Sequence, residues 1–224
     1  MIVSRTPYRV SLFGGGSDYP DWNTVSNRPG SVIGFTINKY SYISLRYLPP
    51  YFYNKYRIAY SKVETTKNPH SINHPAVRNI ILDLKIKQGL EIHHHGDLPA
   101  RTGIGSSSSF TVGLIKALKT LQKRNINKKS LAKLAIHIEQ NVIKENVGSQ
   151  DQIWASYGGL NKIYFHKNNK FDVRKVQINP KRLSELENNL VLIYTGIARN
   201  SDNQSKKIIK NLKSNKDYIN TMID

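Results

Sequence analysis

The segment that most constrains this chain is DLPARTGIGSSSS at residues 97–109. It follows an expected strand at 90–94 and leads into a helix with a regular apolar face. Glycines allow close backbone approach, and the first amides of a helix have no internal partner and bind phosphate groups. The segment contains no Gly-Lys-Ser/Thr and is therefore not a Walker A loop. Taken alone, it fits a phosphate-binding loop and a flexible turn with a serine N-cap equally well.

Hydrophobic periodicity along the rest of the chain predicts an α/β or α+β fold. Segments 31–37 and 40–47 are rich in β-branched and aromatic residues and are expected to pair as two strands. The other expected strands are one through Tyr8, Val10 and Leu12, and segments 160–165, 171–176 and 190–194. The expected helices are 75–88, one carrying Phe110, Leu114, Ala117, Leu118 and Leu121, one starting near Ser130 as N-cap, and a polar helix from about 201.

A second informative segment, EQNVIKENVGSQDQIWASYGG, covers residues 139–159. Glu139 is spaced so that it shares the apolar, inward face of its helix. A carboxylate in that position costs free energy unless it is paired or binds a metal, and magnesium takes oxygen ligands of this kind. The alternatives are that Glu139 reaches an edge and pairs with a lysine, and that Asp151 caps a helix, which is the favoured interpretation of Asp151 from this segment alone.

The third segment, RTPYRVSLFGGGSDYP at residues 5–20, is a strand that ends in three glycines and an aspartate. Such a strand end favours close approach of a ligand. Asp18 is placed to accept hydrogen bonds from sugar hydroxyls, and Arg9 to contact phosphate or a catalytic carboxylate. A glycine-rich turn capped by the aspartate is an equally good interpretation of this segment alone.

Composition narrows the possible partners. The 224 residues carry a formal net charge of +19 and no cysteine, which excludes disulfides and thiolate chemistry and fits a reducing compartment. The N-terminus lacks a signal-peptide pattern, and apolar runs such as 190–194 are too short to span a bilayer, so we expect a cytoplasmic protein with no membrane partner. The lysines are dispersed, which favours a general preference for anions. Nucleic-acid binding is the less favoured interpretation, because zinc-finger spacing and an aromatic RNA-binding signature are both missing.

Two further features are more typical of structure than of chemistry. Neighbouring side chains of a strand alternate between faces, so His93, His94 and His95 cannot converge on one ion, and we expect one or two exposed histidines at a strand end. Trp22 and Trp154 are expected to be packing residues.

The three segments together, in this order, resemble the GHMP kinases. Residues 98–109 resemble the family's phosphate-holding motif Pro-x-x-x-Gly-Leu-Gly-Ser-Ser, and residues 5–20 resemble its first, substrate-side motif. The resemblance implies the family's α+β fold: an N-terminal ATP-binding domain, here residues 1–180, with a mixed sheet and helices, followed by a ferredoxin-like α/β domain that begins at 181–224 and is incomplete.

The same resemblance implies a role for each matching position. Asp151 matches the catalytic aspartate, Arg9 the basic residue near the transferred phosphate, and Glu139 the magnesium ligand, with Ser107 as the second ligand. The implied ATP-binding positions are Pro99, Gly103, Gly105, Ser106, Ser107, Ser108 and Ser109. The implied substrate-binding positions are Gly15, Gly16, Ser17 and Asp18.

Within the family, Gly-Gly-Gly-Ser-Asp at 14–18, Gln-Asp-Gln at 150–152 and Thr-Gly-Ile-Ala-Arg at 195–199 resemble the branch that phosphorylates D-glycero-D-manno-heptose 7-phosphate at its anomeric hydroxyl. The implied partners are ATP, magnesium and a sugar phosphate. The alternatives are another sugar, such as fucose or galactose, and a truncated, inactive relic, because nothing in 181–224 resembles the family's third, glycine-rich motif. The sequence leaves the oligomeric state open.

Overall fold

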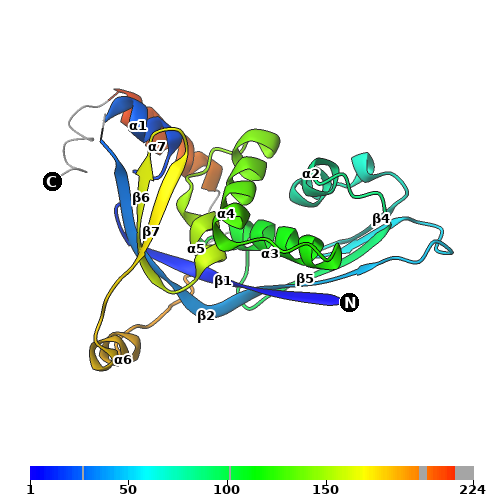
Figure 1. Ribbon diagram of the computed structural model, residues 1–224, viewed down its shortest axis with the longest axis horizontal. Helices are drawn as coiled ribbons and strands as arrows, with labels where there is room; N and C mark the ends of the chain where they lie inside the picture. Colours follow the sequence, from blue (N-terminus) through cyan, green and yellow to red (C-terminus); the bar gives the residue numbers. More distant parts are fainter. Residues whose placement is uncertain (27, 101, 197–200, 215–224) are drawn as a thin grey trace.

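The computed structural model describes residues 1–26, 28–100, 102–196 and 201–214. Within these ranges the fold is α+β: one seven-stranded sheet with helices packed on it (Figure 1). The strands are β1 (Ile2–Phe13), β2 (Gly30–Tyr47), β3 (Tyr56–Ala59), β4 (Val63–Thr66), β5 (Leu90–Gly96), β6 (Leu160–His166) and β7 (Lys170–Lys175). The helices are α1 (Pro20–Val25), the short 3₁₀ turn η1 (Pro69–Ser71), α2 (Pro75–Asp83), α3 (Ser106–Leu121), α4 (Lys128–His137), the π-helical turn η2 (Ile138–Ile143), α5 (Gln150–Tyr157), α6 (Pro180–Asn188) and α7 (Ser201–Ser214).

The long strand β2 organises the sheet. The strand order is β4-β3-β5-β2-β6-β7, with β1 antiparallel to β2. β6 pairs with the first half of β2 and β5 with its second half, and only the β3–β5 pair is parallel among the described strands. The prediction of two paired strands at 31–37 and 40–47 is therefore wrong, because both segments belong to this one strand. The interruption between them is a register irregularity opposite Pro7–Arg9 rather than a turn.

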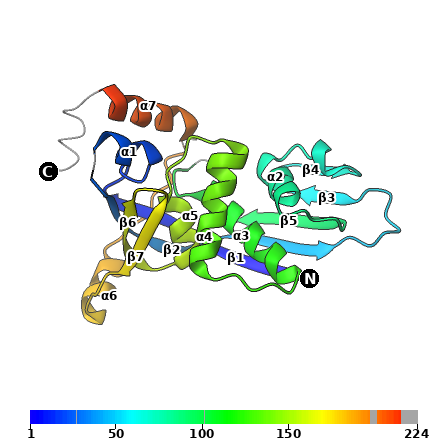
Figure 2. The same cartoon turned by 45° about the horizontal axis from the view of Figure 1, so that its top comes forward.

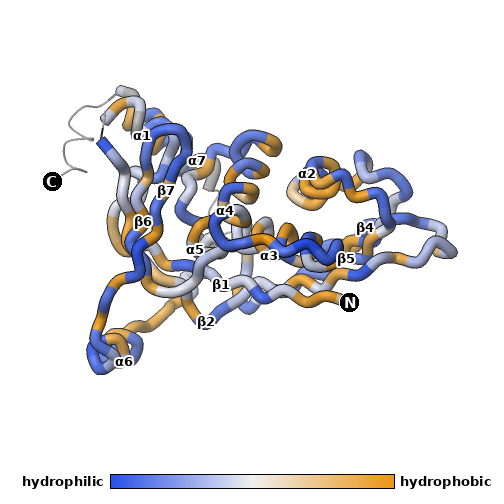
Figure 3. The backbone as a smooth tube through the Cα atoms, viewed as in Figure 1, coloured by the Kyte–Doolittle hydropathy of each residue, from blue (hydrophilic) through white to orange (hydrophobic). Residues whose placement is uncertain are grey.

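The helices cover one face of the sheet, and the main core lies between them. In Figure 1, α2, α3 and α4 lie on the same side of the strands, and in Figure 3 α2 is coloured mainly as hydrophobic. Helix α3 is the centre of this layer, since Leu114, Ile115 and Ala117 have no exposed surface. The α3 side chains pack with Ile43 and Leu45 of β2 and with Ile80 of α2 in one cluster. This packing fixes the N-terminus of α3, and with it the glycine-rich loop, against β1.

Three boundaries differ from the sequence predictions. The helix predicted at 75–88 ends at Asp83, because Lys85 takes a left-handed backbone conformation with φ of 52°. The N-cap of α4 is Asn127 rather than Ser130, and its side chain accepts a hydrogen bond from the Ser130 amide. The strand predicted at 90–94 is confirmed and continues to Gly96.

The strand predicted at 190–194 is wrong. These five residues form neither helix nor strand, and all of their side chains are exposed, from 46% for Leu190 to 81% for Val191. An apolar run becomes a strand only where a neighbouring strand can take its backbone hydrogen bonds, and the described residues offer none here.

The last two helices have different environments. Helix α6 has no buried residue. Helix α7, predicted as a polar helix, instead buries Leu212 against Trp22 of α1, and Ser205 lies 2.9 Å from the Tyr19 hydroxyl. Figures 1 and 2 both show α1 and α7 side by side. Among the described residues, none of the helices is long and apolar enough to cross a membrane.

Candidate active site

The chemical centre of the molecule is an ion pair between β1 and α5. Arg9 binds both carboxylate oxygens of Asp151, with Nε–Oδ1 at 2.7 Å and Nη2–Oδ2 at 2.8 Å. Both side chains are largely shielded, with exposed fractions of 16% and 23%. Burial by itself lowers the pKa of Arg9, but the charge and hydrogen bonds of Asp151 outweigh it and raise the pKa above its ordinary value. Arg9 is thus held as a cation, with its planar donor fork aligned on the carboxylate.

The glycine-rich loop closes over this pair. The Arg9 side chain donates to the carbonyl of Gly103 at 2.7 Å, and its backbone amide donates to the carbonyl of Ile104 at 3.0 Å. Gly105 is the N-cap of α3 with φ of 74°, and a Cβ there would lie 3.2 Å from both the Arg9 Cγ and the Asp151 Oδ2. Glycine is therefore required at 105 for two reasons, the left-handed backbone and the lack of space. Arg101 lies outside the described residues.

The first turn of α3 divides its serines into two sets. Ser106 is half-buried and Ser107 is exposed, so both face the open side of the loop with Pro99 and Gly103. Ser109 is buried and donates its hydroxyl to the Pro7 carbonyl at 2.8 Å, which ties α3 to β1. Ser108, also buried, donates to Glu139 at 2.8 Å. The four serines predicted to contact phosphate are thus split, with two facing outward and two inward.

Glu139 sits in a closed polar pocket. It is 1% exposed, and its Oε2 accepts hydrogen bonds from Ser108 and from Gln152, the latter at 2.5 Å. Burial raises the pKa of the Glu139 carboxyl to about 7, against the effect of the surrounding hydroxyl and amide donors. Its Oε1 and the Gln152 Oε1 are buried without a hydrogen-bond partner that meets the usual geometry in the described chain, and the buried Thr111 hydroxyl is near enough to the carboxyl to lower its pKa.

This donor set fits a divalent cation. A buried carboxylate oxygen without a partner, flanked by hydroxyl and amide oxygens at the N-terminal end of α3, is what a hard cation takes as ligands. The inward position predicted for Glu139 is confirmed. Its neighbours Thr111 and Gln152 were missed, although Gln152 directly follows Asp151 and spacing along α5 could have indicated it. No described contact joins Glu139 to Ser107.

Asp18 is buried beneath the N-terminus of α5. Its carboxylate accepts hydrogen bonds from the amides of Gly16 at 3.1 Å and Gln150 at 3.2 Å. A Cβ at Gly148 would fall 1.9 Å from its Oδ2, so glycine is needed there for close approach. Burial first, and then the charge of Asp151, raise the pKa of Asp18 to about 6. The loop predicted to bind substrate is thus locked onto the element that carries Asp151.

The rest of that loop is shaped by Ser17. Its hydroxyl donates to the Gly14 and Ser31 carbonyls and accepts from the Ser31 amide, so this side chain is directed into the protein. A Cβ at Gly15 would meet nothing within 4 Å, and this residue is the open part of the loop.

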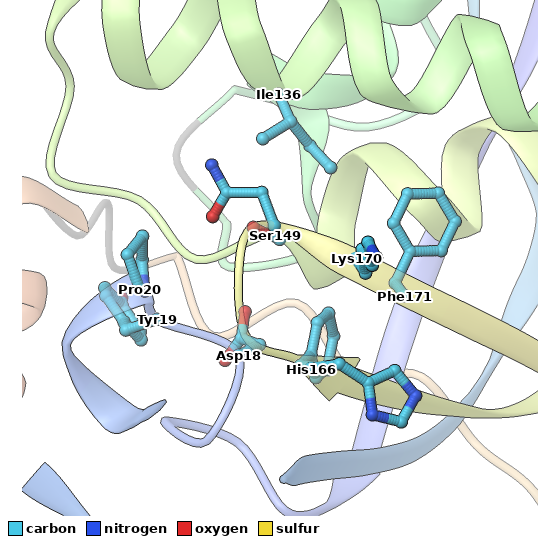
Figure 4. Close-up of a pocket in the computed structure, with 10 residues that line it drawn as sticks. Asp18, Tyr19, Pro20, Ile136, Ser149, His166, Lys170 and Phe171 are labelled. Carbon is cyan, nitrogen blue, oxygen red and sulfur yellow. The ribbon is translucent and has the colours of Figure 1, made fainter. Parts of the chain in front are cut away.

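A small pocket adjoins Asp18 on the side of the β6–β7 hairpin. Figure 4 shows Asp18, Tyr19 and Pro20 on one wall, with Ser149, Ile136, His166, Lys170 and Phe171 around it. His166 pairs with Asp172 at 3.0 Å.

The other singled-out residues take structural positions. Trp22 and Trp154 are buried, as predicted. His94 points into the core against Phe110, where burial lowers its pKa to about 4, while His93 and His95 occupy the opposite face of β5. In the described part of the chain, His, Cys, Asp and Glu residues form no group of three able to hold a metal ion. Of the 195–199 motif, residues 197–199 lie outside the described residues.

The chain is similar to known proteins of one family. Residues 72–159 match the family described as GHMP kinases N terminal domain. The chain is 32% identical over 211 residues to D-glycero-alpha-D-manno-heptose 7-phosphate kinase of Campylobacter jejuni, covering 88% of this chain and 60% of that protein. It is 25% identical over 224 residues to the bifunctional fucokinase/GDP-fucose pyrophosphorylase of Arabidopsis thaliana (91% and 21%) and 27% identical over 207 residues to galactokinase of Pyrococcus furiosus (88% and 54%). The chain thus spans less than two thirds of the length of each of these relatives.

The fold has a matching solved structure. A D-glycero-D-manno-heptose 1-phosphate kinase from Bacteroides thetaiotaomicron superposes with a TM-score of 0.77 at 24% identity, covering 99% of this chain and 74% of that one. This likeness shows the fold, and the sequence relatives supply the ancestry. Residues 72–159 are therefore identified as a GHMP kinase N-terminal domain.

Proposed function

We propose that this protein transfers the γ-phosphoryl group of ATP to the anomeric hydroxyl of a sugar phosphate, with D-glycero-D-manno-heptose 7-phosphate as the expected acceptor. The observation that carries the proposal is the Arg9–Asp151 pair held against the glycine loop at the start of α3. The relationship to the Campylobacter jejuni heptose 7-phosphate kinase supports the choice of acceptor. The reaction consumes ATP, so its expected place is the cytoplasm.

The loop and the first turn of α3 form the proposed binding site for the ATP phosphates. The free amides at this helix terminus, the open glycine at 103 and the outward-facing Ser106 and Ser107 supply donors without side-chain obstruction. Pro99 borders the loop. Ser108 and Ser109, assigned to the same site by resemblance, contribute by anchoring the turn to Glu139 and to β1.

Glu139 is the proposed protein ligand for magnesium, with Ser107 as the second ligand and Ser108 in direct contact with the carboxylate. A bound magnesium ion would neutralise charge on the phosphates. The chain's own part is to keep a carboxylate oxygen unpaired and dry at the end of the phosphate-binding helix, which the burial of Glu139 and its free Oε1 provide.

Asp151 is proposed to orient the sugar hydroxyl and accept its proton. The hydroxyl oxygen then forms a bond to the γ-phosphorus, the bond to the β–γ bridging oxygen breaks, and ADP leaves. Arg9 is proposed to align the Asp151 carboxylate through its two hydrogen bonds and to stabilise the transferring group. Phosphoryl transfer depends mainly on positioning and electrostatics, so a carboxylate can fill this role without being a strong base.

The substrate side of the site is proposed to be the loop 15–18, where Gly15 is open and Asp18 is held beneath α5. We further propose that residues 1–180 form the ATP-binding domain and that 181–224 begin a second one. The lack of buried side chains at residues 172–196 supports this division, although Ser205 and Leu212 of α7 are buried.

The test is ATP turnover by the 224-residue chain with magnesium and D-glycero-D-manno-heptose 7-phosphate, compared with Asp151→Asn. We expect turnover that falls at least about 10³-fold in the variant while ATP binding, followed by calorimetry, is retained. An equal rate in both proteins would remove Asp151 from the chemistry. The ATP-binding measurement shows whether a variant has lost the nucleotide site or only the phosphoryl-transfer step.

The similarity to a galactokinase and to a bifunctional fucokinase supports a second class of candidate acceptor, the unphosphorylated hexoses. The same assay with galactose and fucose decides between them. A higher kcat/KM for either sugar than for the heptose phosphate would replace the proposed acceptor and leave the roles of Arg9 and Asp151 unchanged.

A further inference from the structure

The face of the sheet opposite the helices carries a charge cluster that the proposed reaction does not use. Glu91 of β5 lies directly across from Arg46 of β2 on one side and Arg57 of β3 on the other. Its Oε2 accepts from the Arg46 Nε at 2.5 Å and its Oε1 from the Arg57 Nη1 at 3.1 Å. The His93 Nε2 lies 3.2 Å from the same Oε1. One carboxylate thus fixes two guanidinium groups side by side.

The cluster is remote from the Arg9–Asp151 pair. Arg9 is paired with Thr36 in β2, and Arg46 lies ten residues further along that strand. At about 3.4 Å per residue, the two sites are separated by about 30 Å along the sheet. In Figure 1 the helices next to β5 all lie on the other face of the strands.

The arrangement has unused donors and a surplus of positive charge. Glu91 is 6% exposed, whereas the side chains of Arg46 and Arg57 are 48% and 50% exposed. Glu91 engages one nitrogen of each guanidinium, so the remaining nitrogens of both arginines are available on the solvent side. One buried negative charge against two fixed positive charges leaves a net charge of +1, before any contribution from the imidazoles.

The cluster also lines a hollow. Arg46, Glu91, His93 and His95 border a surface pocket together with Ser44 and Met1. A divalent cation is disfavoured there by the two guanidiniums. A dianion with several acceptor oxygens matches the donors, because arginine binds phosphate oxygens in a bidentate manner.

We propose that this hollow is a second anion site, which binds a phosphate group, free or esterified to a small metabolite, through Arg46 and the imidazoles of His93 and His95, with Arg57 adding positive charge from the other side of Glu91. Glu91 is a positioning residue that sets the spacing of the two arginines. The site lies apart from the transfer centre, and its occupation does not depend on the proposed kinase activity.

The test follows the imidazole NMR signals of His93 and His95 in the 224-residue chain during titration with sodium phosphate, at fixed pH and constant ionic strength maintained with sodium chloride. We expect saturable shifts in the millimolar range. Affinity should fall at least 10-fold in the Arg46→Gln/Arg57→Gln double variant. The matched control is Arg174→Gln, which removes an exposed arginine that packs over Tyr164 on another strand. Shifts that fail to saturate, or equal affinity in the double variant and the control, would overturn the site.

Two further measurements complete the experiment, one with another variant and one with another ligand. Arg9→Gln should leave the His93 and His95 titration unchanged, which distinguishes this site from the proposed transfer site; loss of the shifts in that variant would assign them to the transfer site and overturn the proposal. Ribose 5-phosphate binding more tightly than inorganic phosphate would identify the ligand as a phosphate ester, and equal binding would identify it as free phosphate. If the double variant does not melt cooperatively, Arg46→Gln alone provides the comparison, and a loss of affinity in the same direction is expected.

Discussion

The two arginine–carboxylate groups of the sheet differ in how their charges balance. At one end, Arg9 and Asp151 form a one-to-one pair. Two further buried carboxyls, Asp18 and Glu139, have no cation of their own in contact among the residues that the structure describes. On the open face, Glu91 is matched by two arginines. The pKa values shift accordingly: burial raises those of Asp18 and Glu139 to about 6 and about 7. For Glu91, burial is outweighed by hydrogen bonds from Arg46 and His93, which lower its pKa.

This difference indicates what each region lacks. The first region has a surplus of buried acceptor groups, which is suited to a cation and to hydroxyl donors. The second has a surplus of donors, which is suited to an anion. The same residue types in two parts of the molecule therefore favour ligands of opposite charge. A single substitution in each region can test this difference.

The largest effect is expected from Arg9→Gln, which breaks the one-to-one pair. The variant loses the bidentate contact and the positive charge beside Asp151, so kcat for the phosphoryl transfer should fall about 10³-fold. Arg174→Gln, which removes an exposed arginine, should retain the wild-type rate. Steady-state kinetics of the two variants measures the difference, and similar rates would show that the pair is only structural.

The next effect concerns Asp18 and depends on pH. Its folded-state pKa of about 6 lies above the ordinary 3.8, so the folded chain binds the proton more tightly than the unfolded chain. The associated stability is fully present below pH 3.8 and is lost as the pH rises through about 6. The side chain of Asp18→Asn cannot ionise. The free energy of unfolding of this variant should therefore rise relative to that of the wild type by up to about 3 kcal/mol between pH 4 and pH 7.

Urea unfolding of both proteins across this range gives the difference in free energy at each pH. The values at pH 4 serve as the internal reference for any loss of hydrogen bonds to the Gly16 and Gln150 amides. A difference that stays constant with pH would contradict the raised pKa.

A smaller effect separates two glycines of the same loop. Gly103 and Gly105 both have positive φ, so alanine at either should cost about 1–2 kcal/mol. Only at 105 would the new Cβ crowd the ion pair, at 3.2 Å from Arg9 and from Asp151, whereas at 103 it meets nothing within 4 Å. We expect Gly105→Ala to reduce kcat at least about 10-fold more than Gly103→Ala, because small displacements of the pair spoil its alignment. Equal kinetics would mean that the loop yields without moving the pair.

Sequence reasoning reached the polar groups of the site, and for Arg9 it left phosphate and a catalytic carboxylate open as partners. The spacing of Glu139 within an apolar helix face predicted its burial, because one helix determines that property. The contact between Arg9 and Asp151 joins residues 142 positions apart and depends on how α5 packs on β1, so no local pattern contains it. The same limit applies to the serines of α3, since the rotation of that helix decides that Ser108 donates to Glu139 while Ser107 is exposed. Ser107 as the second magnesium ligand stays a prediction.

The errors in the fold have a similar origin. Residues 30–47 form one strand because β1 pairs along both halves, which composition around Asn38 and Lys39 cannot show. The run at 190–194 has strand composition without a described neighbour to pair with. Strand propensity indicates what a segment can form, and the neighbouring strands available for pairing decide what it does form.

The smallest effect is expected at Glu91, on the open face of the sheet. The pKa of Glu91 is lowered in the folded chain, so its contribution to stability is present above the ordinary value of 4.5 and is lost as the pH falls below it. Because both arginines are about half exposed and screened by solvent, Glu91→Gln should cost less than about 1 kcal/mol at pH 7, and the gap from the wild type should close toward pH 3. This direction is opposite to that expected for Asp18→Asn. The differences in free energy of unfolding between each variant and the wild type should therefore change with pH in opposite directions. Slopes of the same sign would show that the two regions do not differ in charge balance.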